Sequence, residues 1–145
     1  MPLSRTRGII LKSYCYGEAN RLLVIMTREH GRIRAVAKGA RRPKSRMAAA
    51  LQPFTCSDMM LHQRENAELF LVTQGRIANP FKKIRLDLKK IYYGSYMLEI
   101  TGEMTAEREQ STAVYRLLYD ALSLLQETSE PEKVARWFES KMLHS

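Results

Sequence analysis

Short apolar runs alternate with polar residues through the first half of the chain, and the period of this pattern changes after Gly75. The runs have the length of strands, are rich in Ile, Val, Leu and Tyr, and are separated by turn residues, which is typical of a small all-β unit. Gly31, in the turn REHG, can adopt the positive φ that a tight hairpin needs. Five strands are predicted, enough for a small barrel: Arg7–Tyr14, Arg21–Thr27, Arg32–Lys38, Phe54–Gln63 and Glu68–Gln74.

Beyond Gly75 the apolar residues recur every three or four positions, which is the period of an α-helix. Ser129 and Glu132 have the spacing of a capping box, which predicts the start of the last helix at that point. Trp137 and Phe138, in the same helix, are expected to pack in the core. Three helices are predicted: Ile84 to about Met104, Ser111 or Thr112 to about Leu125, and Ser129 toward the end of the chain. The alanine-rich residues 46–51 predict a further short helix. The fold class is therefore expected to be α+β, a five-stranded barrel followed by a helical domain.

The excess positive charge of the chain lies entirely in its first half. The 145 residues carry a net charge of +9. Residues 1–78 hold 14 Lys and Arg against 5 Asp and Glu, a difference of +9, whereas residues 79–145 hold 10 of each kind and are neutral. Together with the change in period, this predicts a basic domain over residues 1–78 and a helical domain over residues 79–145. A polyanion is the natural partner of the basic domain.

Five cations fall within nine consecutive residues, and no carboxylate lies among them. Gly39 and Pro43 keep this stretch out of regular structure, so we expect a basic loop. The alternative is a solvated loop that only raises solubility, but solubility does not require so dense a cluster. The five cations are Lys38, Arg41, Arg42, Lys44 and Arg46.

The third predicted strand, RIRAVAK, places further cations beside this loop. Because successive side chains of a strand point to opposite faces, Arg32 and Arg34 share one face with Val36 and Lys38. Oligonucleotide-binding barrels, the OB-folds, bind their ligands on the face of the second and third strands and on neighbouring loops. If the loop folds back toward the strand, the two sets of cations are expected to form one positive band.

Tyr14 and Tyr16 flank the turn between the first two predicted strands. Single-stranded nucleic acids are commonly held by stacking on aromatic side chains, and either tyrosine is a candidate for that role. The alternative is that one or both rings plug the end of the barrel and leave only their hydroxyl groups in water.

Catalytic and metal-binding patterns are missing from the sequence. It contains no GxxxxGK[ST], GxSxG or HExxH, and no pair of carboxylates has a spacing that suggests acid and base roles. The two cysteines are far apart and the three histidines are scattered, so no metal and no cofactor are expected. We therefore expect a protein that is not an enzyme. With no run of about 18 apolar residues and no signal peptide, we expect a cytoplasmic protein without a membrane partner.

Three stretches resemble the N-terminal part of the RecO family of bacterial DNA-repair and recombination mediators. They are GIILKSYCYGEANRLLVIMTREHGRIRAVAKGARRPKSR, ALQPF and, near the end, RWFE. KGARRPKSR followed shortly by ALQPF is the most specific part, and the resemblance is firmest over residues 7–54. Where many relatives read YGEAD, this chain has Asn20, which keeps turn chemistry.

The resemblance implies an N-terminal OB-fold that binds single- and double-stranded DNA, followed by a helical domain. Members of the family anneal complementary strands. With RecR, and sometimes RecF, they help RecA to replace single-stranded DNA-binding protein on gapped DNA, in the cytoplasm at the nucleoid. Carried over by motif, the resemblance implies phosphate contacts for Lys38, Arg41, Arg42, Lys44 and Arg46, and less firmly for Arg32 and Arg34.

Relatives in the family continue beyond the point where this chain ends, often into a cysteine-containing segment that binds zinc. This chain contains no such segment, so no zinc is expected, and we expect its helical domain to be truncated. Two other functions stay open on the residues alone. The basic barrel could dock acidic protein tails as an adaptor, or it could bind RNA.

Overall fold

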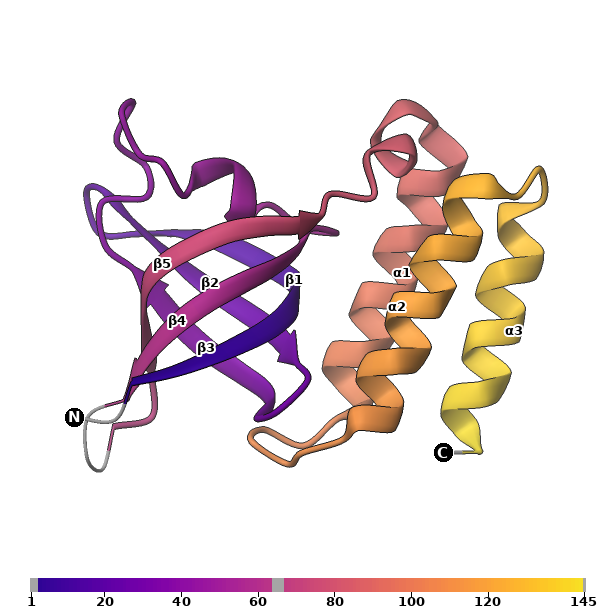
Figure 1. Ribbon diagram of the computed structural model, residues 1–145. Helices are drawn as coiled ribbons and strands as arrows, with labels where there is room; N and C mark the ends of the chain where they lie inside the picture. Colours follow the sequence, from indigo (N-terminus) through magenta and orange to yellow (C-terminus); the bar gives the residue numbers. More distant parts are fainter. Residues whose placement is uncertain (1–2, 64–66, 145) are drawn as a thin grey trace.

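The computed structural model describes residues 3–63 and 67–144, which form a five-stranded barrel followed by three α-helices (Figure 1). The strands are β1 (Leu3–Tyr16), β2 (Asn20–Thr27), β3 (Gly31–Ala37), β4 (Cys56–Gln63) and β5 (Phe70–Asn79). The barrel closes in the order β1-β2-β3-β5-β4, and β3 and β5 pair in parallel. This is the arrangement of an OB-fold, so the predicted α+β class and five-stranded barrel are confirmed.

The long strand β1 explains how so few strands close a barrel. Its first half pairs with β4, from Leu3 opposite His62 to Ile9 opposite Cys56, and its second half pairs with β2. A bulge after Ile10 lies near the change of partner, and such bulges bend a strand and increase its twist. The predicted short helix is a 3₁₀ turn, η1 (Ala48–Leu51).

The alternation of β-strand side chains divides the barrel into an apolar interior and a more varied outer surface. One cluster of buried residues fills the interior. Gly31 has the predicted positive φ, at +70°, in the hairpin between β2 and β3. The interior cluster includes Ile10, Leu23, Ile25, Ile33, Met59, Leu61, Phe70 and Val72.

The helical domain begins with a 3₁₀ turn, η2 (Lys82–Leu86), and not with a continuous helix from residue 84. The helices are α1 (Leu88–Met104), α2 (Thr112–Glu127) and α3 (Pro131–Leu143). Asp87 ends the 3₁₀ turn and caps α1, because its carboxylate accepts from the amide of Lys89 at 2.9 Å. Of the two residues expected at the start of α2, Ser111 or Thr112, it is Ser111 that caps the helix, accepting from the amide of Val114 at 3.2 Å.

Two predictions for the last helix are wrong. Glu130 is the N-cap of α3 and Pro131 is its first residue, so Ser129 lies outside the helix and forms no capping box. Proline is well suited to this first position, because its φ is already helical and an amide there would have no partner. Trp137 is 37% exposed, whereas Phe138 on the neighbouring side of the helix is fully buried.

The helices cover one side of the barrel and share a core with it (Figure 1). Ile9, Leu11 and Met26 point outward from the barrel and pack in the same cluster as Met97 and Leu118. The three α-helices leave the opposite side of the barrel uncovered (Figure 1). In the described part of the chain, the helices are too short or too polar to cross a membrane.

Candidate nucleic-acid interface

The basic loop, residues 38–46, is held against the turn between β1 and β2. Gly39 has a φ of +71°, and its amide donates to Asn20 Oδ1 at 3.0 Å. The amide of Arg41 donates to the carbonyl oxygen of Ala19, also at 3.0 Å. These bonds fix the base of the loop, which stands on the side of the barrel away from the helices (Figure 1).

The cations of the basic loop lie in solvent, and no described carboxylate pairs with any of them. Arg41 donates from its guanidinium to the carbonyl oxygen of Gly17 at 2.8 Å and keeps further donors available. Uncompensated cations on one loop produce a local positive potential that attracts polyanions. The exposed side chains are Lys38, Arg41, Arg42, Lys44 and Arg46.

Tyr14 and Tyr16 are 47% and 43% exposed, so neither ring is buried as a plug in the barrel. They lie on one face of β1, two residues apart, and Tyr16 pairs with Asn20. Since Asn20 also holds the base of the basic loop, the exposed rings and the cations lie at the same end of the barrel.

The segment between α1 and α2, residues 105–110, lies along β3 and covers the strand face where cations were expected to be free. We refer to these residues as the interdomain segment. Arg32 and Glu107 form a parallel β-bridge, and the amide of Arg108 donates to the carbonyl oxygen of Arg32 at 2.8 Å. This single bridge and the hydrogen bond beside it join the helical domain to β3 of the barrel.

This segment binds both predicted strand cations. Arg32 donates from Nε to Thr105 Oγ1 at 3.0 Å and from Nη2 to the Thr105 carbonyl oxygen at 2.8 Å. Arg34 pairs with Glu107 at 2.9 Å and with Glu68 at 3.3 Å, and the Glu107 hydrogen bond raises the pKa of the guanidinium. Val36, on the same row, is buried. Arg32 and Arg34 are therefore occupied by internal partners and are less available to extend the positive surface of the basic loop than expected.

A second group of cations lies over the outer face of β1, β4 and β5, and sequence reasoning had identified only Arg46 among them. An open cavity of about 760 Å³ lies over these strands, and Met47, Met59 and Met60 supply apolar parts of its lining. Its wall contains two carboxylates, Glu29 and Asp58. The arginines that line it are Arg5, Arg7, Arg28, Arg46 and Arg76.

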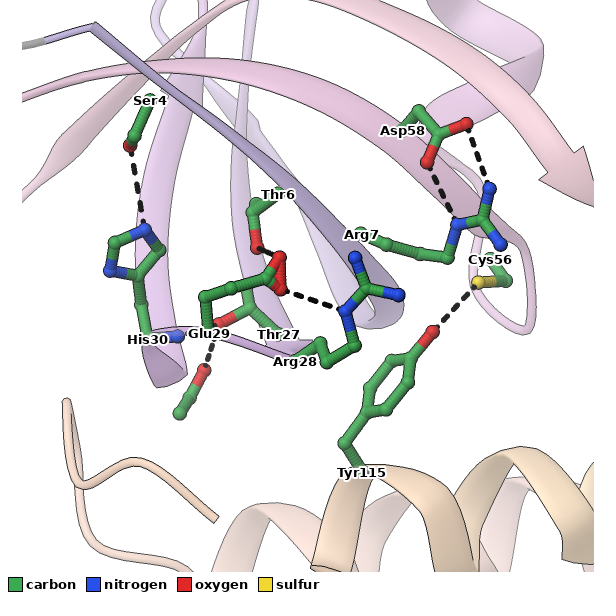
Figure 2. Close-up of polar contacts among 11 residues, drawn as sticks. Ser4, Thr6, Arg7, Thr27, Arg28, Glu29, His30, Cys56, Asp58 and Tyr115 are labelled. Carbon is green, nitrogen blue, oxygen red and sulfur yellow. Dashed lines mark hydrogen bonds and ion pairs between the residues drawn. The ribbon is translucent and has the colours of Figure 1, made fainter. Parts of the chain in front are cut away.

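Arg7, Asp58 and Arg76 lie side by side across the three strands, each at the pairing position of the next. Arg7 donates to the two carboxylate oxygens of Asp58 at 2.8 and 3.2 Å (Figure 2). This hydrogen bonding, with the positive charges of Arg7, Arg76 and Arg28, lowers the pKa of Asp58. Asp58 is therefore a carboxylate held among arginines.

The second carboxylate of the cavity is also paired within the barrel. Glu29 accepts from Arg28 Nε at 3.0 Å and from the Thr6 hydroxyl at 3.1 Å (Figure 2). One sequence signal could have revealed this face. Arg5 and Arg7 alternate in SRTRG, as do outward side chains of a strand, but the predicted first strand began only at Arg7.

Metal binding finds no support in the geometry. Within residues 3–63 and 67–144, no group of three or more His, Cys, Asp and Glu side chains is placed to hold an ion. Cys15 is exposed, and Cys56 is buried with its sulfur 3.4 Å from the Tyr115 hydroxyl.

An OB-fold barrel with an uncompensated basic loop beside exposed aromatic rings is typical of the nucleic-acid-binding class of proteins. Two family models divide the chain between them, "Recombination protein O N terminal" over residues 1–81 and "Recombination protein O C terminal" over residues 85–145. The chain belongs to the RecO family.

Curated relatives named DNA repair protein RecO match nearly the whole chain. Those of Halalkalibacterium halodurans and Alkaliphilus metalliredigens are each 37% identical, over 138 and 142 residues. The relative from Bacillus mycoides is 32% identical over 139 residues. These matches cover 95%, 97% and 96% of this chain but only 54%, 57% and 55% of the relatives. The chain thus spans about half the length of the curated relatives it matches.

Proposed function

We propose that this chain is a DNA-binding protein of recombination and repair, and that the basic loop is its main contact with the phosphate backbone. The observation that carries the proposal is the set of exposed loop cations without carboxylate partners in the described chain, beside two exposed tyrosines. The names of the relatives, DNA repair protein RecO, support the same biological role. Tyr14 and Tyr16 stack on bases of a bound strand in this proposal.

Arg32 and Arg34 have a different part in the proposal. Their guanidinium groups already donate to the interdomain segment, so fewer donors are left for phosphates. Their role is to fix β3 and, through it, the first residue of the basic loop, Lys38. Any contact they make with DNA is secondary.

The mechanism needs no bond chemistry. Loop cations neutralise phosphates, and this lowers the repulsion between two complementary strands as they pair. Annealing of single strands follows directly from that effect. Help in loading RecA onto DNA covered by single-stranded DNA-binding protein, together with RecR and in some cases RecF, is the wider role we propose for the chain.

The test is a variant with three loop cations removed, Arg41→Ala, Arg42→Ala and Lys44→Ala. Five phosphate contacts give a log–log dependence of affinity on salt with a slope of about −3.5, and two remaining contacts give about −1.4. Fluorescence anisotropy with a labelled single-stranded oligonucleotide over a salt series measures both slopes. A matched control removes three exposed cations of the helices, with Lys89→Ala, Arg116→Ala and Lys141→Ala.

The control variant is expected to keep the slope of the wild type. Equal losses of DNA affinity in the loop variant and the control variant would mean that overall charge, and not the loop, determines binding. Wild-type affinity that does not change with salt would refute the proposal. Competition with an RNA oligonucleotide of the same sequence, and with an acidic peptide, identifies the preferred polyanion, and preference for either competitor would also refute it.

A further inference from the structure

The arginine-lined cavity on β1, β4 and β5 carries more positive than negative charge. Its five arginines and two carboxylates leave a net charge of 5 − 2 = +3. Both carboxylates are already paired, Asp58 with Arg7 and Glu29 with Arg28. Arg5, Arg46 and Arg76 make no ion pair with any described carboxylate. Three guanidinium groups are thus available to an anion that enters the cavity.

The cavity also adjoins the basic loop. Arg46 is the last cation of the loop and at the same time lines the cavity. The next residue, Met47, precedes η1 and lies close to Gly75 of β5. A Cβ on Gly75 would be 4.0 Å from Cγ of Met47. Arg76 follows Gly75 and lies in the row with Asp58 and Arg7. The cations therefore continue from the loop across the open side of the barrel.

The chemistry of the cavity suits a nucleic acid backbone. Guanidinium groups bind phosphate oxygens in a bidentate way, and the half-buried side chains of Met47 and Met60 beside them offer flexible apolar contact to sugars or bases. A volume of about 760 Å³ is ample for a nucleotide. Arg5 and Arg76 project from strands β1 and β5, so these two guanidinium groups stand on a rigid support, whereas Arg46 projects from the basic loop.

We propose that this cavity is a second phosphate-binding part of the DNA interface, in which Arg5, Arg46 and Arg76 bind the backbone of the strand that leaves the basic loop. The inference rests on the proposed function and extends it by naming the path of the strand. Asp58 limits the affinity of this part, because it holds Arg7 in an internal ion pair.

The experiment compares two variants with opposite expected effects on DNA affinity. Arg5→Gln with Arg76→Gln removes two phosphate contacts, so affinity for a long oligonucleotide falls several-fold at low salt and the salt slope becomes shallower by about 1.4. Asp58→Asn releases Arg7, so affinity for the same oligonucleotide rises. The control, Arg116→Gln with Lys141→Gln, removes the same charge from exposed positions of α2 and α3 and leaves both quantities unchanged.

The length of the DNA probe locates the effect. Sites on OB-folds cover about 4 to 16 nucleotides, so single strands of about 4 and about 16 nucleotides are the probes. The short probe binds to the wild type and to the cavity variants alike, whereas the long probe distinguishes them. Gain of affinity in Asp58→Asn cannot come from misfolding, which keeps the test valid if the double arginine variant is unstable.

Two outcomes separate this inference from the proposed function. If the loop variant loses affinity while the cavity variants bind the long probe as the wild type does, the path through the cavity is refuted and the proposed function stands. If the wild type binds neither probe, both fail. Two long strands bound to each chain at saturation would also overturn the inference, because a single path holds one strand.

Discussion

Gly94 shows how one residue sets the distance between the helices and the barrel. It lies in the middle of α1, where a Cβ would be 2.7 Å from Cε1 of Phe54 and 3.1 Å from Cδ2 of Leu125. Phe54, just before β4, holds a φ of +75°, which directs its ring beneath the helix. Its amide donates to the carbonyl oxygen of Ile10 at 3.1 Å, so the backbone there is fixed. The absence of a side chain at position 94 therefore allows this contact.

Gly94→Ala is expected to destabilise the protein by about 1–3 kcal/mol, because the aromatic ring or the helix must move. In the same helix, a Cβ on Gly102 would have no neighbour within 4 Å, so Gly102→Ala is the matched control. It should stabilise by about 0.5–1 kcal/mol, the usual gain when alanine replaces glycine in a helix. Urea unfolding followed by circular dichroism measures both. Equal stabilisation by the two substitutions would contradict the proposed contact.

At the scale of the elements, the interdomain segment joins the helical domain to the barrel through backbone and side chain together. Arg108, with a φ of +63°, donates to the carbonyl oxygens of Ala67 and Glu68 at 2.7 Å each and lies over the ring of Phe70, 4.9 Å from its centre. The hairpin between β2 and β3 also packs against the interdomain segment, and Gly31 is its point of close approach. A Cβ there would be 2.2 Å from the carbonyl oxygen of Glu109.

Gly31→Ala is therefore expected to lower the free energy of unfolding more than an ordinary glycine-to-alanine substitution at positive φ does. Gly17 is the matched control. Its φ of +66° is close to the +70° of Gly31, but a Cβ on Gly17 would be 3.7 Å from its nearest neighbour atom. Gly17→Ala should cost about 1–2 kcal/mol from the left-handed backbone alone. Gly31→Ala should lose about 1–3 kcal/mol more, since the backbone of the interdomain segment must shift. Equal losses in thermal or urea unfolding would show that the segment is not packed against the hairpin.

For the molecule as a whole, local pattern predicted much of the fold. The five strands, the hairpin at Gly31 and the cap at Ser111 all depend on residues close in the chain, whose side-chain period or backbone preference is visible in the sequence. The exposed basic loop was visible for the same reason. The predicted capping box at Ser129 failed because Pro131 offered a better first residue two positions later.

What the sequence could not supply were contacts between distant residues. Arg32 donates to Thr105 and Arg34 donates to Glu107, and in each pair the two residues are 73 positions apart in the sequence. A count of nearby carboxylates in the sequence could therefore not show that these guanidinium groups have partners. The arginine-lined cavity is hidden for the same reason, because it collects Arg7, Arg28 and Arg76 from three separate parts of the chain. Pairing of β4 with both β1 and β5 brings Arg7 and Arg76 together, and the amide of Arg28, which donates to the carbonyl oxygen of Arg7, adds the third.

The shared core of barrel and helices predicts how the whole protein responds to alkaline pH. Burial raises the pKa of the Cys56 thiol on β4 and of the Tyr115 hydroxyl on α2, which face each other where the two domains meet. A group whose pKa is higher in the folded state stabilises the fold fully below its unfolded pKa, and that stability is lost as the pH rises toward the folded value. The unfolded values are about 8.5 for cysteine and about 10 for tyrosine.

The free energy of unfolding should therefore fall as the pH rises above about 8.5, and more steeply above about 10, in one transition for both domains. Cys56→Ala should remove the decrease in unfolding free energy that begins near pH 8.5, and Tyr115→Phe should remove the decrease that begins near pH 10. Both expectations concern the pH dependence and hold for any change in stability that the substitutions cause at neutral pH. Urea unfolding from pH 7 to 11, followed by circular dichroism and by tryptophan fluorescence from Trp137, measures the slopes. Separate transitions for the two signals would contradict the shared core, and unchanged slopes in both variants would show that these buried groups do not govern alkaline unfolding.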